Sequence, residues 1–452
     1  MKVGVVGAGL AGLSAACALA DAGHRVVLLE RRPWAGGKTY SFTDRRTGDD
    51  IDNGQHILMR CTTAYVEFLR RIGSLDRIRW QPRLAVPVLD AGGRRADITA
   101  ARLPAPLHLA PSLLGYRHLS LADRARVFRG AASMLRSGPD RADQAFGDWL
   151  RRRGQTGRLI RSFWDLFVVP TLNCPAEEAD VAQALFVFRT GFLRSPDASA
   201  IGLPQVGLSD LHVRPSLRYV EERGGAFLPG AAVEGVETCD RRVLAVHLRS
   251  GERIEADAWV LAVPPAEALG LLPEPWRGRE PFRGLRAFRT APIVNVHLWF
   301  DGPVFPYDFA AFVGCDLQWV FNQSRIRGVW GPEGAERLVV SLSDARRHVA
   351  VHPRALVDRL VAELRRAVPG VAAQRLLRWK VIKEPHATFV PEPGLRRPGP
   401  ETPMANLVLA GAYTDSGWPA TMESAVRSGL AAAAAIERRR AALERVRVGA
   451  VA

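Results

Sequence analysis

Residues 3–12 read VGVVGAGLAG, an apolar strand that runs into a glycine-rich turn and then into a helix-like segment. In this arrangement Gly7 permits the tight turn, Gly9 lets the backbone approach a pyrophosphate, and Gly12 allows the helix to pack closely on the strand. The stretch therefore predicts an α/β fold that binds the phosphates of a dinucleotide.

A second strand, Arg25 to Leu29, follows this helix and ends on Glu30, eighteen residues past Gly12. A carboxylate at this position accepts hydrogen bonds from ribose hydroxyls, and its charge argues against a 2′-phosphate. The helix begins at Leu10 and Ala11, whose N–H groups are expected at the phosphates. A lone glycine-rich turn is a weak signal, but here strand, helix, strand and terminal acid occur together.

A glycine pair followed by a cation, Gly36-Gly37-Lys38, comes shortly afterwards. It suits a second close approach of backbone and positive charge to a pyrophosphate, which simple NAD dehydrogenases do not usually have. With residues 51–56, IDNGQH, it resembles the FAD-binding opening of the flavin amine oxidoreductase superfamily, which includes monoamine oxidases, phytoene desaturases and protoporphyrinogen oxidases. Lys38 replaces the family's usual arginine, which keeps the charge but loses the bidentate fork. The resemblance implies FAD contacts at Arg31, Gly36, Gly37, Lys38, Gly54, Gln55 and His56.

The far end of the chain supports the same resemblance. Residues 406–411, NLVLAG, read as a strand into a glycine turn, and residues 413–423, YTDSGWPATME, lead into a helix expected to begin near Ser424. In the superfamily the matching segment brings backbone amides and a helix N-terminus against the pyrimidine edge of the flavin. Relatives generally have an acid where this chain has Ala412. The resemblance therefore implies the loss of a hydrogen bond near the ribityl-phosphate region, which either weakens FAD binding or leaves the contact to Asp415. The resemblance implies cofactor contacts at Gly411, Ala412, Trp418, Thr421 and Met422.

Three stretches look more specifically like the squalene-associated FAD-dependent desaturase group, namely residues 51–56, 382–389 and 415–423. The characterised activity of that group is hydroxysqualene dehydroxylation. Residues 292–300, PIVNVHLWF, are a further shared strand, so the resemblance spans nearly the whole chain. The identity of the substrate is expected to be encoded between residues 102 and 215.

With 452 residues, 47% of them hydrophobic, the chain is long enough to bury a large core in two interwoven domains. The predicted fold class is α/β, with a Rossmann-like FAD-binding domain of the amine oxidase type interwoven with an α+β substrate domain. Residues 1–85, 216–280 and 385–440 are assigned to the discontinuous FAD domain, residues 86–215 and 281–384 to the substrate domain, and residues 441–452 to a basic C-terminal tail. The family's return strand implies that the backbone of Val233 lies beside the adenine.

Five cysteines, an odd number without a CxxC pair, indicate a reducing compartment and predict neither a disulfide framework nor a metal site. Some amine oxidases attach FAD through a cysteine near the C-terminal motif, but residues 409–422 contain none. Non-covalent FAD is therefore expected.

The formal net charge is +16, with a sequence pI of about 10.6. The arginines are dispersed and no nucleic-acid-binding motif accompanies them, so no nucleic-acid partner is expected. Arginine-rich composition also accompanies GC-rich genomes. The functional alternative is attraction to an anionic membrane surface, at roughly 1 kcal/mol for each basic residue near the headgroups.

No stretch reaches the roughly 20 apolar residues of a transmembrane helix. Residues 103–121 are apolar but contain three prolines, and the N-terminal apolar run is explained by the first strand rather than by a signal peptide. We therefore expect a cytoplasmic protein, with peripheral binding to the inner face of the cell membrane. One group of residues in this stretch has three possible roles: an interfacial face, the mouth of a substrate tunnel or an ordinary core helix. The group consists of Leu107, Leu109, Leu113, Leu114 and Tyr116.

The resemblance implies a flavin that moves a hydride, while the protein supplies position and electrostatics. In reductive dehydroxylation the hydroxyl is a poor leaving group, so a general acid is expected to protonate it. His56 is the first candidate because it lies near the expected flavin and titrates near neutral pH. Its alternative role is a structural hydrogen bond. Further catalytic candidates are Glu423, Asp415 and Lys383, each of which also suits a helix cap or an ion pair.

Three classes of function remain open. The first is FAD-dependent reductive dehydroxylation of hydroxysqualene to squalene, a hydrophobic isoprenoid of hopanoid biosynthesis, with NADPH or a partner reductase as the electron source. The second is desaturation of a phytoene-like polyprenoid, or oxidation of an amine, by the same fold. The third is a flavin-binding protein without catalysis. A dehydroxylase needs electrons and a desaturase needs an electron acceptor, so reductant preference separates the first two.

Overall fold

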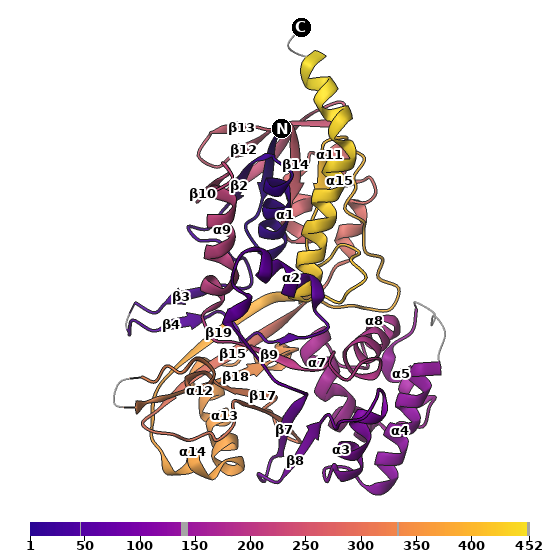
Figure 1. Cartoon of the computed structure of the whole chain (residues 1–452), viewed down its shortest axis with the longest axis vertical. Coiled ribbons are helices and arrows are strands. Elements are labelled where there is room, and N and C mark those ends of the chain that lie inside the picture. Colours follow the sequence, from indigo (N-terminus) through magenta and orange to yellow (C-terminus); the bar gives the residue numbers. More distant parts are fainter. Residues whose placement is uncertain (46, 137–142, 332–333, 450–452) are drawn as a thin grey trace.

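The computed structural model describes residues 1–45, 47–136, 143–331 and 334–449. Figure 1 shows two lobes along the long axis, with both chain termini in the upper lobe. The upper lobe is built on a five-stranded parallel sheet of order β10-β2-β1-β14-β20. Its strands are β1 (Lys2–Val6), β2 (Arg25–Glu30), β10 (Ala226–Pro229), β14 (Ala258–Leu261) and β20 (Leu407–Leu409).

Helices cover this sheet because its central strands are apolar on both faces, as parallel strands usually are. Helix α1 (Leu10–Asp21) is rich in alanine and packs directly on the long helix α15 (Met422–Gly449). The approach is close, since a Cβ on Gly429 would lie 2.3 Å from the carbonyl oxygen of Ala11. The remaining elements of the lobe are α2 (Thr63–Arg71), α9 (Arg214–Glu221), α10 (Pro265–Leu271), α11 (Glu274–Arg277) and the antiparallel sheet of β11 (Val233–Cys239), β12 (Arg242–Leu248) and β13 (Arg253–Glu255).

The lower lobe is built on a seven-stranded sheet of order β19-β15-β18-β17-β16-β7-β8. All its neighbouring strands are antiparallel except β16 and β7. Residues of α13 and α14 bury one face of the sheet together with the apolar side chains of β15 and β18. The elements are β7 (Ala85–Asp90), β8 (Arg95–Thr99), β15 (Thr290–Phe300), β16 (Phe309–Val313), β17 (Trp319–Asn322), β18 (Glu336–Leu342), β19 (Leu376–Phe389), α12 (Gln323–Arg327), α13 (Pro353–Ala367) and α14 (Pro369–Ala373).

Helices and an aromatic core lie on the other side of this lobe. The core includes Phe146, Trp164, Phe167 and Phe188, which make close ring contacts with one another. No helix in the described residues combines the length and the apolar character needed to cross a bilayer. The helices are α3 (Ala110–Gly115), α4 (Leu121–Arg136), α5 (Phe146–Arg151), α6 (Gly157–Leu159), α7 (Asp165–Leu172) and α8 (Val181–Phe188), with π-helical turns at Ile160–Trp164 and Arg189–Leu193. A third π-helical turn, Ser209–Val213, leads into α9 of the upper lobe.

Short strands and the long strands β15 and β19 connect the lobes (Figure 1). The short strands form two small sheets: β3 (Ser41–Thr43) with β4 (Asp50–Asp52), and β9 (Ile201–Pro204) between β5 (Leu58–Met59) and β6 (Ile78–Trp80).

Two expected boundaries differ from the structure. The boundary at residue 385 falls inside β19, because this strand continues its pairing with β15 as far as Phe389. The segment expected to be a basic tail from residue 441 continues α15 to Gly449, since AALERVRV consists mostly of helix-compatible residues. The remaining division into an FAD domain and a substrate domain stays a prediction.

Candidate functional site

The glycine-rich turn after β1 is crowded against neighbouring backbone. Gly7 has a φ of 101°, and a Cβ there would lie 2.6 Å from the carbonyl oxygen of Ala262. A Cβ on Gly12 would lie 1.9 Å from the carbonyl oxygen of Gly7. Helix α1 begins after Gly9, and its first N–H groups have no intrahelical acceptors, as at the start of any helix. Within the described residues no side chain caps these groups. Such a helix N-terminus fits a phosphate group.

Glu30 ties this turn to the following segment. Its side chain is buried, and its two carboxylate oxygens accept the N–H groups of Ala8 and Arg32, each at 3.0 Å. The N–H of Gly36 donates to the carbonyl oxygen of Ala8 at 2.8 Å. A carboxylate offers about four acceptor positions, so capacity for ribose hydroxyls remains. The predicted ribose contact of Glu30 is compatible with this geometry.

Two further predicted cofactor residues, Val233 and Arg31, lie near the same end of the sheet. Pro229 of β10 pairs with Glu30, and Val233 begins β11 four residues later. The exposed guanidinium of Arg31 pairs with Glu267 at 3.6 Å. Their contacts with adenine and phosphate stay predictions.

Lys38 contacts the strand β19, and its contact with the pyrophosphate stays a prediction. Its ammonium donates to the carbonyl oxygens of His386 and Ala387, at 3.0 Å for the latter, and burial lowers its pKa. These bonds attach the glycine pair to β19 and engage the group that was expected to face the pyrophosphate. The structure thus gives Lys38 a role in joining the lobes, because both of these acceptors are protein carbonyls.

Residues 53–56 form a loop after β4 that residues of β15 and α12 contact. Asn295 accepts the N–H of Gln55 at 3.3 Å, and its amide nitrogen would lie 3.0 Å from a Cβ on Gly54. The side-chain carbonyl of Gln55 accepts a hydrogen bond from Gln323. Residues of the lower lobe therefore fix the backbone directly before His56.

His56 has a defined tautomer. Its Nδ1 lies 3.0 Å from the carbonyl oxygen of Gly54, which only accepts, so Nδ1 carries the proton. Burial lowers the pKa of His56 below its ordinary value. At pH 7 the imidazole is therefore neutral, and its Nε2 accepts hydrogen bonds. The role of His56 as proton donor stays a prediction, and it requires the protonated form of the imidazole.

Two fully buried histidines, His212 and His297, lie around this loop. His212 has both ring nitrogens in hydrogen-bonding contact, with Tyr65 and with Thr39, and burial lowers its pKa to about 4. His297 on β15 has a pKa lowered to about 3 by burial, and its ring nitrogens have no hydrogen-bond partner among the described residues. Both imidazoles are neutral at pH 7.

The C-terminal segment forms a second loop, between β20 and α15. The N–H of Gly411 donates to the hydroxyl of Ser428 at 2.9 Å, and the hydroxyl of Ser424 donates to the carbonyl oxygen of Ala412 at 3.1 Å. Helix α15 begins at Met422, directly after Thr421 and slightly before the expected start near Ser424. The predicted strand, glycine turn and helix are therefore present in this order.

A partly buried arginine organises this loop. Arg397 donates to the carbonyl oxygens of Ala412, Tyr413, Thr414 and Trp418, at 2.8 Å for Ala412. Burial lowers its pKa to about 10, so the guanidinium remains charged at pH 7. It gathers successive backbone groups of the segment expected to contact the flavin.

The structure places the other catalytic candidates in supporting positions. Glu423 is fully buried, accepts the N–H groups of Ala64 and Tyr65 at the start of α2, and pairs with Arg427 at 2.7 Å. Lys383 donates to the carbonyl oxygen of Val351 at 2.6 Å. Asp415 is exposed and accepts the N–H of Gly417 at 3.2 Å. None of these contacts assigns a catalytic role to the three residues, and a helix cap, a backbone contact and a turn explain them.

The sequence did not identify Asn295, His297 and Arg397 as site residues. Asn295 and His297 lie two residues apart on a strand, so both face the same side, and their polarity within PIVNVHLWF was the available signal. Arg397 lies beside Arg396 in the sequence, and only the fold shows which of the two is partly buried.

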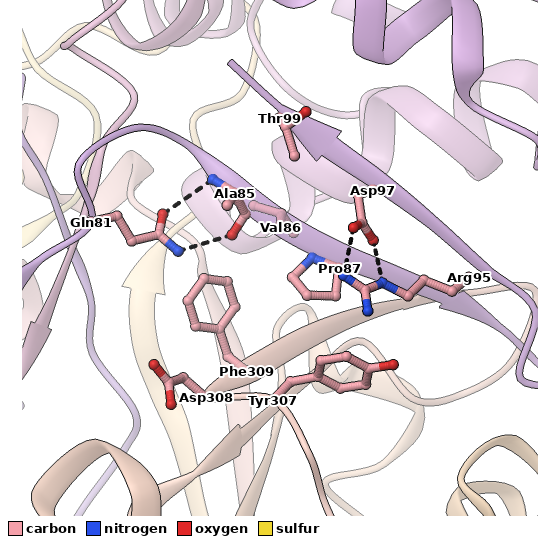
Figure 2. Close-up of a pocket in the computed structure, with 10 residues that line it drawn as sticks. All are labelled: Gln81, Ala85, Val86, Pro87, Arg95, Asp97, Thr99, Tyr307, Asp308 and Phe309. Carbon is pink, nitrogen blue, oxygen red and sulfur yellow. Dashed lines mark hydrogen bonds and ion pairs between the residues drawn. The ribbon is translucent and has the colours of Figure 1, made fainter. Parts of the chain in front are cut away.

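A surface pocket of about 190 Å³ lies away from these loops, between β7, β8 and the segment before β16 (Figure 2). Figure 2 shows Arg95 paired with Asp97, and the Gln81 amide bonded to the backbone of Ala85. Because its polar groups are engaged with one another and none is a predicted cofactor residue, we assign this pocket no role in catalysis.

Two segments from opposite ends of the chain that are predicted to bind the cofactor thus adjoin one sheet. The model of flavin-containing amine oxidoreductases matches residues 10–437. The chain belongs to this family. It is therefore an FAD-dependent oxidoreductase, and the predicted superfamily and α/β fold are confirmed. The crowded glycine turn and the uncapped start of α1 fit the ADP half of such a cofactor.

Relatives of known name match almost the full length. The chain is 30% identical to a hydroxysqualene dehydroxylase of Sinorhizobium fredii over 96% of this chain and 97% of that protein. It is 26% identical to a 15-cis-phytoene desaturase of Synechococcus elongatus, over 98% of each chain. Among solved structures, an oxidoreductase from Methanosarcina mazei matches with a TM-score of 0.73 at 16% identity, over 95% of this chain and 99% of the other. A putrescine oxidase matches with a TM-score of 0.71 at 17% identity, over 97% and 99%.

Proposed function

We propose that this chain uses FAD to convert hydroxysqualene to squalene by reductive dehydroxylation. The similarity that carries this proposal is the full-length match to a hydroxysqualene dehydroxylase. In the reaction the allylic C–O bond breaks, a C–H bond forms at the same carbon, and the hydroxyl leaves as water after taking up one proton. The two electrons come from NADPH or a partner reductase. An apolar substrate of this kind also favours peripheral attachment to the cytoplasmic face of a membrane.

The chain offers a binding group for each part of the cofactor. The turn at Gly7 and Gly9 with the start of α1 would hold the phosphates, Glu30 the ribose, and the loop after Gly411 the flavin. Bound FAD supplies hydride transfer. The protein residues supply position, exclude water and handle the proton.

The surroundings of His56 suit an apolar substrate. Ile57 and Met59, directly after His56, pack against the aromatic core of the lower lobe, which includes Phe163 and Phe192. Such a core excludes water and favours an isoprenoid chain. At neutral pH the Nε2 of His56 can accept a hydrogen bond from a hydroxyl or a water molecule. Protonated at Nε2, it donates the proton that the leaving hydroxyl requires.

Desaturation of a polyprenoid is the second candidate function, since the phytoene desaturase relative also matches the full length. Amine oxidation has less support. Trp418 contacts Phe186 edge to face at a centroid distance of 4.9 Å, and the guanidinium of Arg427 lies 5.2 Å from its ring centre. The indole therefore already has an aromatic and a cationic neighbour from the protein.

Anaerobic single-turnover kinetics test the proposal. Enzyme with reduced FAD is expected to reoxidise when mixed with hydroxysqualene and to yield one squalene per flavin, measured by flavin absorbance and mass spectrometry. Reduced enzyme that ignores hydroxysqualene, while oxidised enzyme is bleached by phytoene, would replace this proposal with the desaturase function.

Replacing His56 with alanine is expected to slow this reoxidation about 100-fold, which is a typical contribution of a general acid. Because burial lowers the pKa of His56, its protonated fraction rises as the pH falls through and below 6.5. The wild-type rate is therefore expected to increase toward acid pH, and the H56A rate to lack this increase. His247→Ala is the matched control, since His247 is an exposed histidine of β12 paired with Glu237. Equal pH profiles for wild type and H56A would give His56 a purely structural role.

A further inference from the structure

Half of the large apolar side chains that are exposed in the described structure lie in one segment of the lower lobe. They are Leu103, Leu107, Leu114, Leu121 and Leu135, and Leu121 is the most exposed of them at 79%. The segment includes α3 and α4, which lie at the lower end of the molecule in Figure 1, far from the C-terminal end of α15. We call residues 102–136 the α3–α4 segment.

Helix α4 has apolar residues on two opposite faces. Val127, Gly130 and Met134 are buried and face the core. The opposite stripe follows the spacing of four and three residues that places side chains on one helix face. It consists of Leu121, Ala125, Phe128, Ala132 and Leu135, none of which is buried. The outer stripe is thus an apolar helix face on which Leu121, Ala125 and Leu135 are exposed and Phe128 and Ala132 are partly exposed.

The charge around this face is strongly positive. The α3–α4 segment contains six arginines and a single acid, Asp123, which pairs with Arg126 at 2.8 Å. Arg102, Arg117 and Arg136 are exposed and have no ion-pair partner among the described residues. Exposed apolar side chains and exposed cations in one segment match the chemistry of an anionic lipid surface.

The inner side of the same segment packs on the core that adjoins His56. Tyr116 is only 1% exposed and meets Phe163 edge to face at 5.8 Å, and Leu109 and Leu113 pack against the same core. These three residues were candidates for an interfacial face, but the fold turns them inward. The segment therefore separates the aromatic core next to the predicted flavin site from the exterior.

We propose that the outer face of the α3–α4 segment docks on a membrane surface that contains anionic lipid. This docking would place the wall of the substrate lobe against the lipid phase that dissolves an isoprenoid. The purpose of the docking, but not the docking itself, rests on the proposed function. The composition favours lipid over a protein partner. Protein interfaces concentrate their binding energy in tryptophan, tyrosine and arginine and are poor in leucine hot spots, whereas this face is aliphatic with a cationic border.

Flotation of the FAD-loaded enzyme with vesicles tests the proposal. Binding is expected with phosphatidylcholine vesicles that contain phosphatidylglycerol, and it is expected to weaken without phosphatidylglycerol or with added salt. The triple variant L107S/L114S/L121S is expected to lose about 10-fold or more in partitioning, because three apolar side chains no longer leave water. R102E/R117E is expected to lose a similar factor on anionic vesicles only.

The matched control is L244S/V329S/L377S, which removes three exposed apolar side chains outside the α3–α4 segment. It is expected to bind like the wild type. Equal losses in both triple variants, or unchanged binding of L107S/L114S/L121S, would overturn the proposal. The proposal would also be overturned if the wild type did not bind vesicles but formed a concentration-dependent dimer that L107S/L114S/L121S abolishes. The face would then be covered by a second copy of the chain.

Turnover of detergent-solubilised hydroxysqualene separates this proposal from the proposed function. Both triple variants are expected to keep the wild-type flavin spectrum and single-turnover rate in detergent. Vesicle binding by an enzyme that does not reduce hydroxysqualene would contradict the proposed function and leave the docking surface in place. Turnover of hydroxysqualene by an enzyme that does not bind vesicles would contradict the docking surface and leave the proposed function in place.

Discussion

Replacement of Gly12 by alanine is expected to give a purified protein with almost no bound flavin. A Cβ at this position would lie 1.9 Å from the carbonyl oxygen of Gly7, which is backbone and has no flexible end to move aside. Gly7 itself has a φ of 101° and lies against Ala262, so the turn cannot retreat. The start of α1 must shift instead, and with it the N–H groups expected at the phosphates.

Strain of this kind typically amounts to a few kcal/mol, so FAD affinity is expected to fall about 100-fold. The flavin-to-protein absorbance ratio and titration of the apoprotein with FAD measure the effect. Gly270→Ala in α10 is the matched control, because no heavy atom lies within 4 Å of a Cβ there. That variant is expected to keep its full flavin content. A G12A protein with the wild-type flavin ratio would contradict the placement of the phosphates at this turn.

The sequence predicted the strands, turns and helices of the expected cofactor-binding segments well because their signals are local. The glycines, the apolar run of β1 and the acid at the end of β2 all lie within one strand, helix and strand unit. The C-terminal strand and turn were predicted for the same reason. Even there the start of α15 was misplaced by two residues, since a helix end depends on capping contacts that the sequence only suggests.

Contacts between distant parts of the chain were not predictable in the same way. Glu423 was a catalytic candidate, but its carboxylate caps α2, more than 350 residues earlier in the chain. The leucines and Tyr116 of the α3–α4 segment show a related limit. Both faces of such a segment contain apolar residues, and only the packed fold shows that Tyr116 faces the core while Leu121 faces outward.

Arg397 shows how the fold distinguishes two adjacent residues, and its replacement is the second change with a large expected effect. In Arg397→Leu, the carbonyl oxygens of Ala412, Tyr413, Thr414 and Trp418 lose their shared donor. Each buried acceptor left unsatisfied costs about 1–3 kcal/mol. Water reaches some of them, so we expect the free energy of unfolding to fall by about 3 kcal/mol.

The flavin is expected to be lost along with this stability, because the same carbonyl groups shape the loop after Gly411. Arg397→Lys keeps the charge, but a lysine presents its donors at a single point and does not reproduce the planar fork. It is therefore expected to retain less FAD than the wild type and more than R397L. Arg396→Leu is the matched control, since Arg396 is exposed and directly adjacent. Denaturant unfolding measures the change in stability, and the flavin-to-protein absorbance ratio measures the loss of FAD. An R397L protein with the stability and flavin content of the wild type would show that the loop holds its shape without this guanidinium.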